Sequence, residues 1–388
     1  MSSLLKPLTG YVPASQFADR VVGPPTALLS AGQLDRARDD PLSFRFSVGR
    51  RARASQNRAA EWLARSEESG ALRAFGPAML AYRQTDRNAS TTGVVADVSL
   101  RAYDTGALKR HEDTIPRTER KMAKYMRTTR LFGNPIALAH RPISTVAEAI
   151  ATATRRHPDE NFKTVDGVRH ELWFIQGQDA AELEQVYDVP LYVTDGHHRL
   201  AAALIVAHEG DFETARMPAG IFATTELQVA AFARCIVNPA LDASGVVDRL
   251  SYEHDLQEVE PTQARPTRRF EFGVQIRGRH FRMRISQDRV PADPYEALDV
   301  NLLQNLILGP VFGITNPGRD KRLRFVAETP TAGVDDLDVD AWFLPFPASV
   351  ADVMRVADSG RVMPQKSTWF GPKLPSGLVI RTIDWRKS

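Results

Sequence analysis

The stretch at residues 189–208 constrains the fold of this chain more than any other. Residues 189–193 (VPLYV) form a short apolar run with β-branched and aromatic side chains, which predicts a buried strand. Residues 200–208 (LAAALIVAH) are strong helix formers. Residues 194–199 (TDGHHR) lie between the two runs and contain one glycine. The sequence therefore predicts a strand that turns at Gly196 directly into a helix.

The turn at residues 194–199 also contains groups that could bind an anion, bind a metal ion or accept a proton. The first N–H groups of a helix have no partner within it, and the helix dipole is positive at this end, so anions bind there. Arg199 would add a bidentate donor for a phosphate or carboxylate. Asp195 can cap the helix, bind a metal ion or accept a proton. An ordinary cap and turn is equally compatible with these six residues.

The composition narrows the class of protein. With 388 residues, the chain can form two domains or one large domain with a sizeable core. Its 50 basic and 47 acidic residues leave a net charge of only +3, which does not indicate nucleic acid, although a pI near 9.0 suits an anionic ligand. Cys235 is the only cysteine, and we find neither a signal-peptide pattern nor an apolar run of the ~20 residues that span a bilayer. We therefore expect a cytoplasmic protein that does not enter a membrane.

A second polar cluster, residues 109–114 (KRHEDT), precedes a helix that we expect to begin at Pro116 or Arg117, since proline suits the first helical position. His111 and Glu112 lie together in this loop, a place where site residues concentrate. Glu112 is a candidate proton acceptor; alternatively, its charge only favours the N-terminus of the helix.

The helix predicted after the cluster is amphipathic. Basic residues three or four positions apart form one of its faces: Arg117, Arg120, Lys121, Lys124, Arg127 and Arg130. Such a face is typically exposed to solvent. The alternative is a wall of positive charge beside a substrate that carries phosphate.

A third polar stretch lies near the C-terminus, at residues 363–373 (MPQKSTWFGPK). Its polar side chains could contact an anion or close over a site: Lys366, Ser367, Thr368 and Lys373. Spacing alone favours a simpler interpretation, a polar loop anchored by Trp369 and Phe370.

The whole chain alternates between strand-like and helix-like segments, which predicts an α+β fold with helices packed on a mixed sheet. Residues 41–48 alternate between apolar and polar side chains and predict a strand. We expect two lobes, residues 1–240 with the first two polar clusters and residues 241–388 with the third, divided near a polar segment at about residues 240–265. The sequence does not indicate an oligomeric state.

Four stretches together resemble the domain-of-unknown-function family 1015. They are residues 195–199 (DGHHR), residues 109–114 (KRHEDT), residues 298–300 through 313–314 (LDV to GI) and the ending MPQKSTWFGPK with Ser376-Gly377-Leu378. The resemblance extends from about Pro7 to Ile380. One such match would be weak, but four matches in the family's order are specific.

This family is similar to the ParB and sulfiredoxin-like fold, which includes free serine kinases. The resemblance implies a kinase that uses ATP or ADP, with Mg²⁺, to phosphorylate the hydroxyl of L-serine or a related small hydroxy compound. It implies a catalytic cluster of Glu112, Asp195 and His111, in which Asp195 or Glu112 accepts the hydroxyl proton and both carboxylates are candidate Mg²⁺ ligands. The residues implied to bind the nucleotide are Gly196, His197, His198, Arg199, Arg110, Lys366, Ser367 and Thr368.

The chain departs from the family in places. A tyrosine and an aspartate of the family are replaced around Thr26-Ala27, another tyrosine is replaced by Leu200, and a P-T-H-R segment is replaced by residues 232–235 (FARC). These departures leave the acceptor substrate open and admit a nucleotide-binding paralogue with altered catalysis. A further alternative is a ParB-like regulator that binds nucleic acid under nucleotide control, although the small net charge does not favour it.

Overall fold

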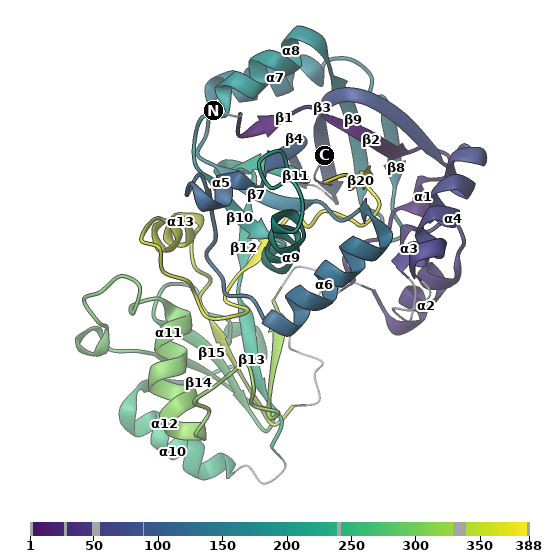
Figure 1. Ribbon diagram of the computed structural model, residues 1–388. Helices are drawn as coiled ribbons and strands as arrows, with labels where there is room; N and C mark the ends of the chain where they lie inside the picture. The colour runs from purple at the N-terminus through teal and green to yellow at the C-terminus, as the bar shows by residue number, and fades with distance from the viewer. Residues whose placement is uncertain are drawn as a thin grey trace. The chain divides into compact units, whose positions relative to one another are not determined.

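Figure 1 shows the computed structural model of the protein. The structure describes residues 3–26, 29–48, 55–87, 89–238, 242–328 and 339–385. Backbone contacts divide the chain into two compact units: Met1–Leu227 together with Pro372–Ser388, and Gln228–Gly371. These units differ from the lobes expected at 1–240 and 241–388, chiefly because the chain returns to the first unit at Pro372.

The first unit is built on a mixed sheet. Its strands are, in spatial order, β5 (Leu108–Lys109), β10 (Leu191–Asp195), β7 (Ile136–His140), β11 (Arg216–Ala223), β4 (Ala89–Ser99), β3 (Leu72–Asp86), β9 (Arg169–Ile175) and β8 (Glu160–Lys163), with β1 (Leu5–Lys6) beside β4 and β2 (Leu8–Pro13) beside β3. β10 runs parallel to β5 and β11 runs parallel to β7, whereas the other pairings are antiparallel. A separate antiparallel pair joins β6 (Leu131–Phe132) and β20 (Arg381–Thr382).

β10 is a buried strand, as the sequence predicts. Leu191 and Val193 are completely buried, and β5 and β7 flank the strand on its two edges. Val193 pairs with Leu138, but the next pairing joins Asp195 to Ala137, so the register shifts at this point. The regular ladder therefore ends where the polar turn begins.

Helices accompany this sheet in the first unit. They are α1 (Ala18–Val21), α2 (Ala31–Asp39), α3 (Phe44–Val48), α4 (Ser55–Glu68), α5 (Arg101–Asp104), α6 (Pro116–Thr129), α7 (Ser144–Ala153), α8 (Gly177–Val186), α9 (His197–His208) and the 3-10 turn η3 (Thr224–Glu226). α7 packs beside α8, and α6 packs beside α9 (Figure 1). Ala202, Ala203 and Ala207 of α9 are completely buried, so the alanine-rich run supplies the small side chains that close packing requires.

α6 begins at Pro116, one of the two residues at which we expected it to start. Its buried side chains are Ala123, Met126 and Thr129. The predicted basic residues are all exposed: Arg117, Arg120, Lys121, Lys124, Arg127 and Arg130. The predicted amphipathic pattern is therefore confirmed, with the positive charges on the solvent side.

The strand predicted at residues 41–48 is wrong, because Phe44–Val48 form helix α3. The side chains of Phe44 and Ser47, three positions apart, are both buried, as helical spacing requires. Phe44 packs edge-to-face on Trp62 of α4 with ring centroids 5.4 Å apart, and Trp62 Nε1 donates to the carbonyl of Leu42 at 3.0 Å. Packing on α4 thus outweighs the local preference for a strand.

The second unit contains, among its described residues, a six-stranded antiparallel sheet. The strands are, in spatial order, β14 (Asp255–Glu258), β16 (Arg279–Arg284), β15 (Glu271–Ile276), β18 (Ala341–Pro345), β13 (Phe232–Ile236) and β17 (Leu323–Ala327), and β12 (Gln228–Ala230) pairs separately with β19 (Trp369–Gly371). The helical segments are α10 (Ala243–Glu253), η4 (Pro261–Gln263), η5 (Gln287–Arg289), α11 (Asp299–Leu303), the π-helical η6 (Gln304–Leu308), α12 (Gly309–Phe312) and α13 (Val350–Asp358).

Each unit has its own apolar core. In the first unit the core lies against the mixed sheet and includes Leu138, Val193 and Leu200. In the second unit Phe272, Leu303 and Phe343 belong to a separate cluster. The predicted fold class, α+β with helices packed on a mixed sheet, is confirmed. In the described parts of the chain, no helix is both long and apolar enough to cross a membrane.

Candidate functional site

The turn between β10 and α9 depends on its glycine. Gly196 has a φ of +95°, in the left-handed region that favours glycine. A Cβ atom there would lie 2.8 Å from Ile136 Cγ2 and 3.0 Å from Arg199 Cζ, so there is also no space for a side chain. Gly196, the N-cap residue of this twelve-residue helix, has no side chain with which to cap it. The N–H groups of a first helical turn attract anions, so the start of α9 suits an anionic ligand.

Asp195, the last residue of β10, lies between two cations. Lys373 Nζ contacts its Oδ1 at 2.5 Å, and the Arg199 guanidinium donates to its Oδ2. Burial alone would raise the pKa of Asp195, but the positive charges of Lys373 and Arg199 outweigh burial and hold the pKa below its usual range. Asp195 is therefore ionised at neutral pH and is a weak proton acceptor.

Arg199 holds the start of α9 against the loop before β7. Its Nη1 donates to the carbonyl oxygens of Pro135 at 2.5 Å and Asn134 at 3.1 Å, while Nη2 donates to Asp195. With these three contacts, the Arg199 side chain is only 20 % exposed. These contacts hold the turn in place, and the predicted role of Arg199 as a phosphate donor stays a prediction.

Two buried histidines lie next to this ion cluster. The rings of His111 and His197 pack edge-to-face with centroids 4.6 Å apart. Burial lowers the pKa of His111 to about 4, against the opposing effect of a hydrogen bond with the Val193 backbone. Burial and the neighbouring His111 likewise lower the pKa of His197 well below its usual value. Both imidazoles are therefore neutral at pH 7 and add no positive charge.

His198 has a different neighbour. Its Nε2 accepts a hydrogen bond of 3.0 Å from the backbone N–H of Ile115, the residue that precedes α6. This bond occupies an N–H group at a helix start and joins the first turns of α6 and α9. His198 therefore links the second polar cluster to the β10–α9 turn.

Two polar atoms beside the turn are buried and form no hydrogen bond with any residue that the structure describes: Thr194 Oγ1 and His197 Nε2. A buried polar atom that lacks a partner costs ~1–3 kcal/mol. A bound ligand would supply a missing partner, so His197 Nε2, the start of α9 and Lys373 together fit a phosphate-bearing molecule.

The second polar cluster lies on the same unit. Glu112 is half-buried and follows the buried His111 in the chain. Arg110 is exposed, with its guanidinium 3.8 Å from the carboxylate of Asp113. The contact between His111 and His197 brings the second polar cluster to the start of α9. The catalytic role of Glu112 and the phosphate-binding role of Arg110 stay predictions.

Lys366, Ser367 and Thr368 belong to the second unit. Lys366 is exposed, and its Nζ lies 5.3 Å from the centroid of the Phe232 ring. Ser367 is buried and donates from Oγ to the carbonyl of Pro364 at 2.5 Å. Their predicted contact with a nucleotide stays a prediction.

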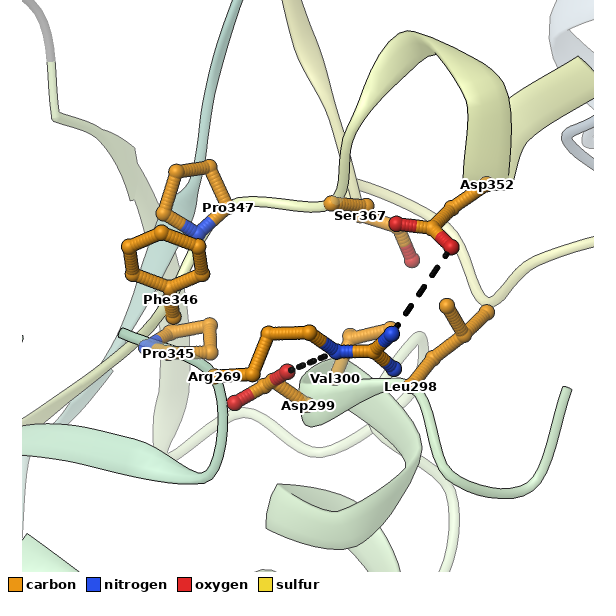
Figure 2. Close-up of a pocket in the computed structure, with 10 residues that line it drawn as sticks. Arg269, Leu298, Asp299, Val300, Pro345, Phe346, Pro347, Asp352 and Ser367 are labelled. Atoms are coloured by element: carbon orange, nitrogen blue, oxygen red, sulfur yellow. Dashed lines mark ion pairs between the residues drawn. The ribbon is translucent and has the colours of Figure 1, made fainter. Parts of the chain in front are cut away.

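Ser367 also lines a small cavity in the second unit (Figure 2). Arg269 lies there between two buried carboxylates, 3.9 Å from Asp299 and 4.0 Å from Asp352. The cavity volume is about 10 Å³, the size that one water molecule needs. Asp299 belongs to the family-like LDV stretch and Ser367 to the family-like ending, so two of the four matching stretches meet at this cavity.

A larger hollow of about 450 Å³ lies in the first unit beside residues 188–190, just before β10. Its lining includes Leu4, Ala102 and Ala107, and none of the predicted site residues.

The described residues contain no group of three or more His, Cys, Asp or Glu side chains that could hold a metal ion. Both oxygens of Asp195 already contact cations. Asp195 and its neighbours therefore do not fit a resident metal centre.

The described residues at which the chain departs from the family are buried in a core or hydrogen-bonded within the protein. Leu200 is buried in the core of the first unit. Thr26 Oγ1 accepts a hydrogen bond from Arg45 at 2.9 Å, whereas Ala27 lies outside the described residues. Arg234 donates to the carbonyls of Phe232 and Lys366.

Lys373 is the site residue whose place sequence reasoning missed. The sequence groups it with Lys366, seven positions earlier, but the structure places it in the first unit on Asp195. The one sequence signal for a functional role of Lys373 was its position in a stretch that resembles the family. The neighbouring residues do not indicate that its partner lies 178 positions away.

Comparison with solved structures finds similar chains at low sequence identity. A free serine kinase variant in complex with AMP is 15% identical, with 78% of this chain and 95% of that chain covered and a TM-score of 0.41. A free serine kinase variant in complex with ADP is 16% identical, with 78% and 96% covered and a TM-score of 0.41. SbnI with a C-terminal truncation, from Staphylococcus aureus, is 11% identical, with 72% and 85% covered and a TM-score of 0.41.

Comparison with protein families gives a direct assignment. None of the curated proteins compared with this chain matches it. The model of the family described as protein of unknown function (DUF1015) matches residues 5–301, well over half of the chain. The family resemblance expected from the four sequence stretches is thereby confirmed, and the chain belongs to the DUF1015 family.

Proposed function

We propose that this chain is an ATP-dependent kinase that phosphorylates the hydroxyl of free L-serine or a related small hydroxy compound. The observation that carries the proposal is the N-terminus of α9, which begins two residues after Asp195, the partner of Lys373. Helix N–H groups and a lysine suit the charge of nucleotide phosphates. The resemblance of residues 109–114 and 195–199 to the kinase-related family supports the same activity.

Phosphoryl transfer requires positioning and charge neutralisation more than covalent help from the protein. The N–H groups at the start of α9 and Lys373 would hold the phosphates, and Arg199 would keep the turn in place through Asn134 and Pro135. Magnesium would arrive with the nucleotide and neutralise phosphate charge. No step assigned to the protein's residues depends on a metal centre.

Glu112 is the proton acceptor in this proposal. The substrate hydroxyl transfers its proton to the Glu112 carboxylate while its oxygen bonds to the terminal phosphorus of ATP, and the bond from that phosphorus to ADP breaks. Asp195 is a poorer choice, since Lys373 and Arg199 occupy its oxygens and hold its pKa down. General-base help is typically worth ~10²–10⁴-fold in rate.

Mass spectrometry tests this function. Purified protein, Mg²⁺ and ATP, or ADP in a second series, would be incubated with L-serine and with a panel of small hydroxy acids. We expect O-phosphoserine or another phosphorylated product, with a turnover lowered ~10²–10⁴-fold in Glu112→Gln. Asp113→Asn, which removes a neighbouring exposed carboxylate, is the matched control and should retain activity.

Absence of every phosphorylated product would contradict the kinase proposal. If nucleotide still bound, the result would favour the alternative of a nucleotide-binding paralogue with altered catalysis. Full activity in Glu112→Gln would leave the kinase standing but remove Glu112 as the base.

One observation favours a second candidate, a ParB-like regulator that binds nucleic acid. The exposed face of α6 carries Arg117, Arg120, Lys121 and Lys124. Retention on DNA that falls steeply with salt, and is lost when these residues become glutamine, would support the regulator. Retention that is absent at low salt would contradict it.

A further inference from the structure

The two cations on Asp195 are held in different ways. Arg199 makes three contacts within the protein, two of them to backbone carbonyls, and its guanidinium packs against Gly196. Moving it toward a ligand would break all of these contacts. Lys373 contacts Asp195 with the ammonium group at the end of a flexible four-carbon side chain, which can turn toward another partner without moving the backbone.

Asp195 tolerates the departure of Lys373. A buried carboxylate that loses its only cation is strongly destabilised. Asp195, however, would keep the Arg199 guanidinium on Oδ2 after Lys373 leaves Oδ1. The exchange therefore leaves no unpaired charge in the site.

The backbone that carries Lys373 is firmly attached to the first unit. Gly377 N–H donates to the Gly133 carbonyl at 2.6 Å, and Ile380 and Tyr11 exchange two backbone hydrogen bonds of 2.8 and 2.9 Å. Leu378, Val379 and Ile380 are completely buried. Lys373 therefore reaches the turn from a fixed segment, which suits a residue that must position a ligand.

A second, independent observation indicates a ligand beside this ion pair. His197 interacts electrostatically with both Asp195 and Lys373, and its Nε2 is buried without a hydrogen-bond partner in the described part of the structure. His197 is 9 % exposed, and its neutral imidazole can donate to or accept from a ligand oxygen.

We propose that Lys373 binds the terminal phosphate of the nucleotide and that Asp195 holds Lys373 in its place until the nucleotide arrives. The proposal rests on the proposed function and adds two things to it. Lys373 becomes a specificity residue that distinguishes nucleotides by their terminal phosphates. Asp195 becomes an internal competitor of the ligand.

Isothermal titration calorimetry with ATP, ADP and AMP tests this exchange, with wild type beside Lys373→Met and Asp195→Asn. Lys373→Met should weaken ATP binding roughly 10- to 100-fold, as expected for a lost charge-assisted contact, and should change AMP binding much less. Asp195→Asn should strengthen ATP binding, because the competing carboxylate is gone. Lys163→Met, on the opposite edge strand β8, loses the same charge and should bind as wild type does.

The possible outcomes distinguish failure of the proposed kinase function from failure of this inference alone. Wild type that binds none of the three nucleotides overturns the proposed function and this inference with it. Wild type that binds ATP while Lys373→Met binds it equally well overturns the inference alone. Weaker ATP binding by Asp195→Asn would show that Asp195 assists the ligand and would also overturn the exchange. Thermal unfolding of each variant checks that it is folded, and Asp195→Asn gives an independent test if Lys373→Met is not.

Discussion

At the scale of single residues, Asp299 makes the stability of the second unit depend on pH. Its carboxylate is buried, accepts a hydrogen bond of 2.6 Å from the Phe270 N–H, and faces Arg269 and Asp352. Burial raises its pKa to about 7; the Phe270 hydrogen bond and Arg269 oppose this effect, while the charge of Asp352 reinforces it. Arg355 in turn contacts Asp352 at 2.6 Å. Protonation of Asp299 therefore removes an unfavourable buried charge.

The raised pKa of Asp299 determines how the free energy of unfolding changes with pH. Since the folded pKa is above the unfolded one, the folded state binds more protons between these values, and stability falls as pH rises through this window. We expect Asp299 to lower the free energy of unfolding by up to ~1.4 kcal/mol per pH unit between pH 5 and 6. Urea unfolding at both pH values should show a smaller loss in Asp299→Asn. Asp288→Asn, an exposed site in the same unit, should behave as wild type does, and an equal slope in all three proteins would contradict this account.

At the scale of elements, α3 is held by a close contact with the loop before β7. A Cβ atom on Gly133 would lie 2.2 Å from two ring carbons of Phe44, whose side chain is completely buried. Gly133→Ala should therefore cost ~1–3 kcal/mol of stability through overpacking. The cost should be smaller in a Phe44→Leu background, because the ring is gone. Urea unfolding of the double-mutant cycle measures this coupling, with Gly76→Ala as a control, since a Cβ there meets nothing within 4 Å.

Local patterns predict those elements whose signals are local. The strand and helix β10 and α9 follow from an apolar run, a glycine and an alanine-rich run. Helix α3 was missed because the packing of Phe44 on Trp62 decides it. The His111–His197 contact and the Asp195–Lys373 ion pair were missed because they join positions far apart in the chain.

At the scale of the whole molecule, the two units differ in how the chain forms them: one is a continuous segment and the other combines two segments. The second unit is one continuous segment, Gln228–Gly371, with its own apolar cluster. The first unit is discontinuous and includes the last segment of the chain, which pairs with Tyr11 and contacts Asp97 through Arg381 at 3.1 Å. The local sequence does not indicate this return, because it consists of short pairings between segments far apart in the chain, such as the two-residue pair of β6 and β20.

This division predicts different consequences for two truncations. A chain that ends at Gly371 loses the buried side chains of Leu378, Val379 and Ile380, each worth ~1.5–3 kcal/mol, and this loss is comparable to the 5–15 kcal/mol that holds a typical domain together. We expect its first unit to unfold at much lower urea concentration, and a peptide of residues 372–388 added in excess to restore the transition. The separate segment 228–371 should fold alone, with a cooperative transition seen by circular dichroism. If the first unit is equally stable after truncation, residues 372–388 contribute nothing to its stability. The segment that carries Lys373 would then not be firmly attached, and the contact of Lys373 with Asp195 would have no rigid support.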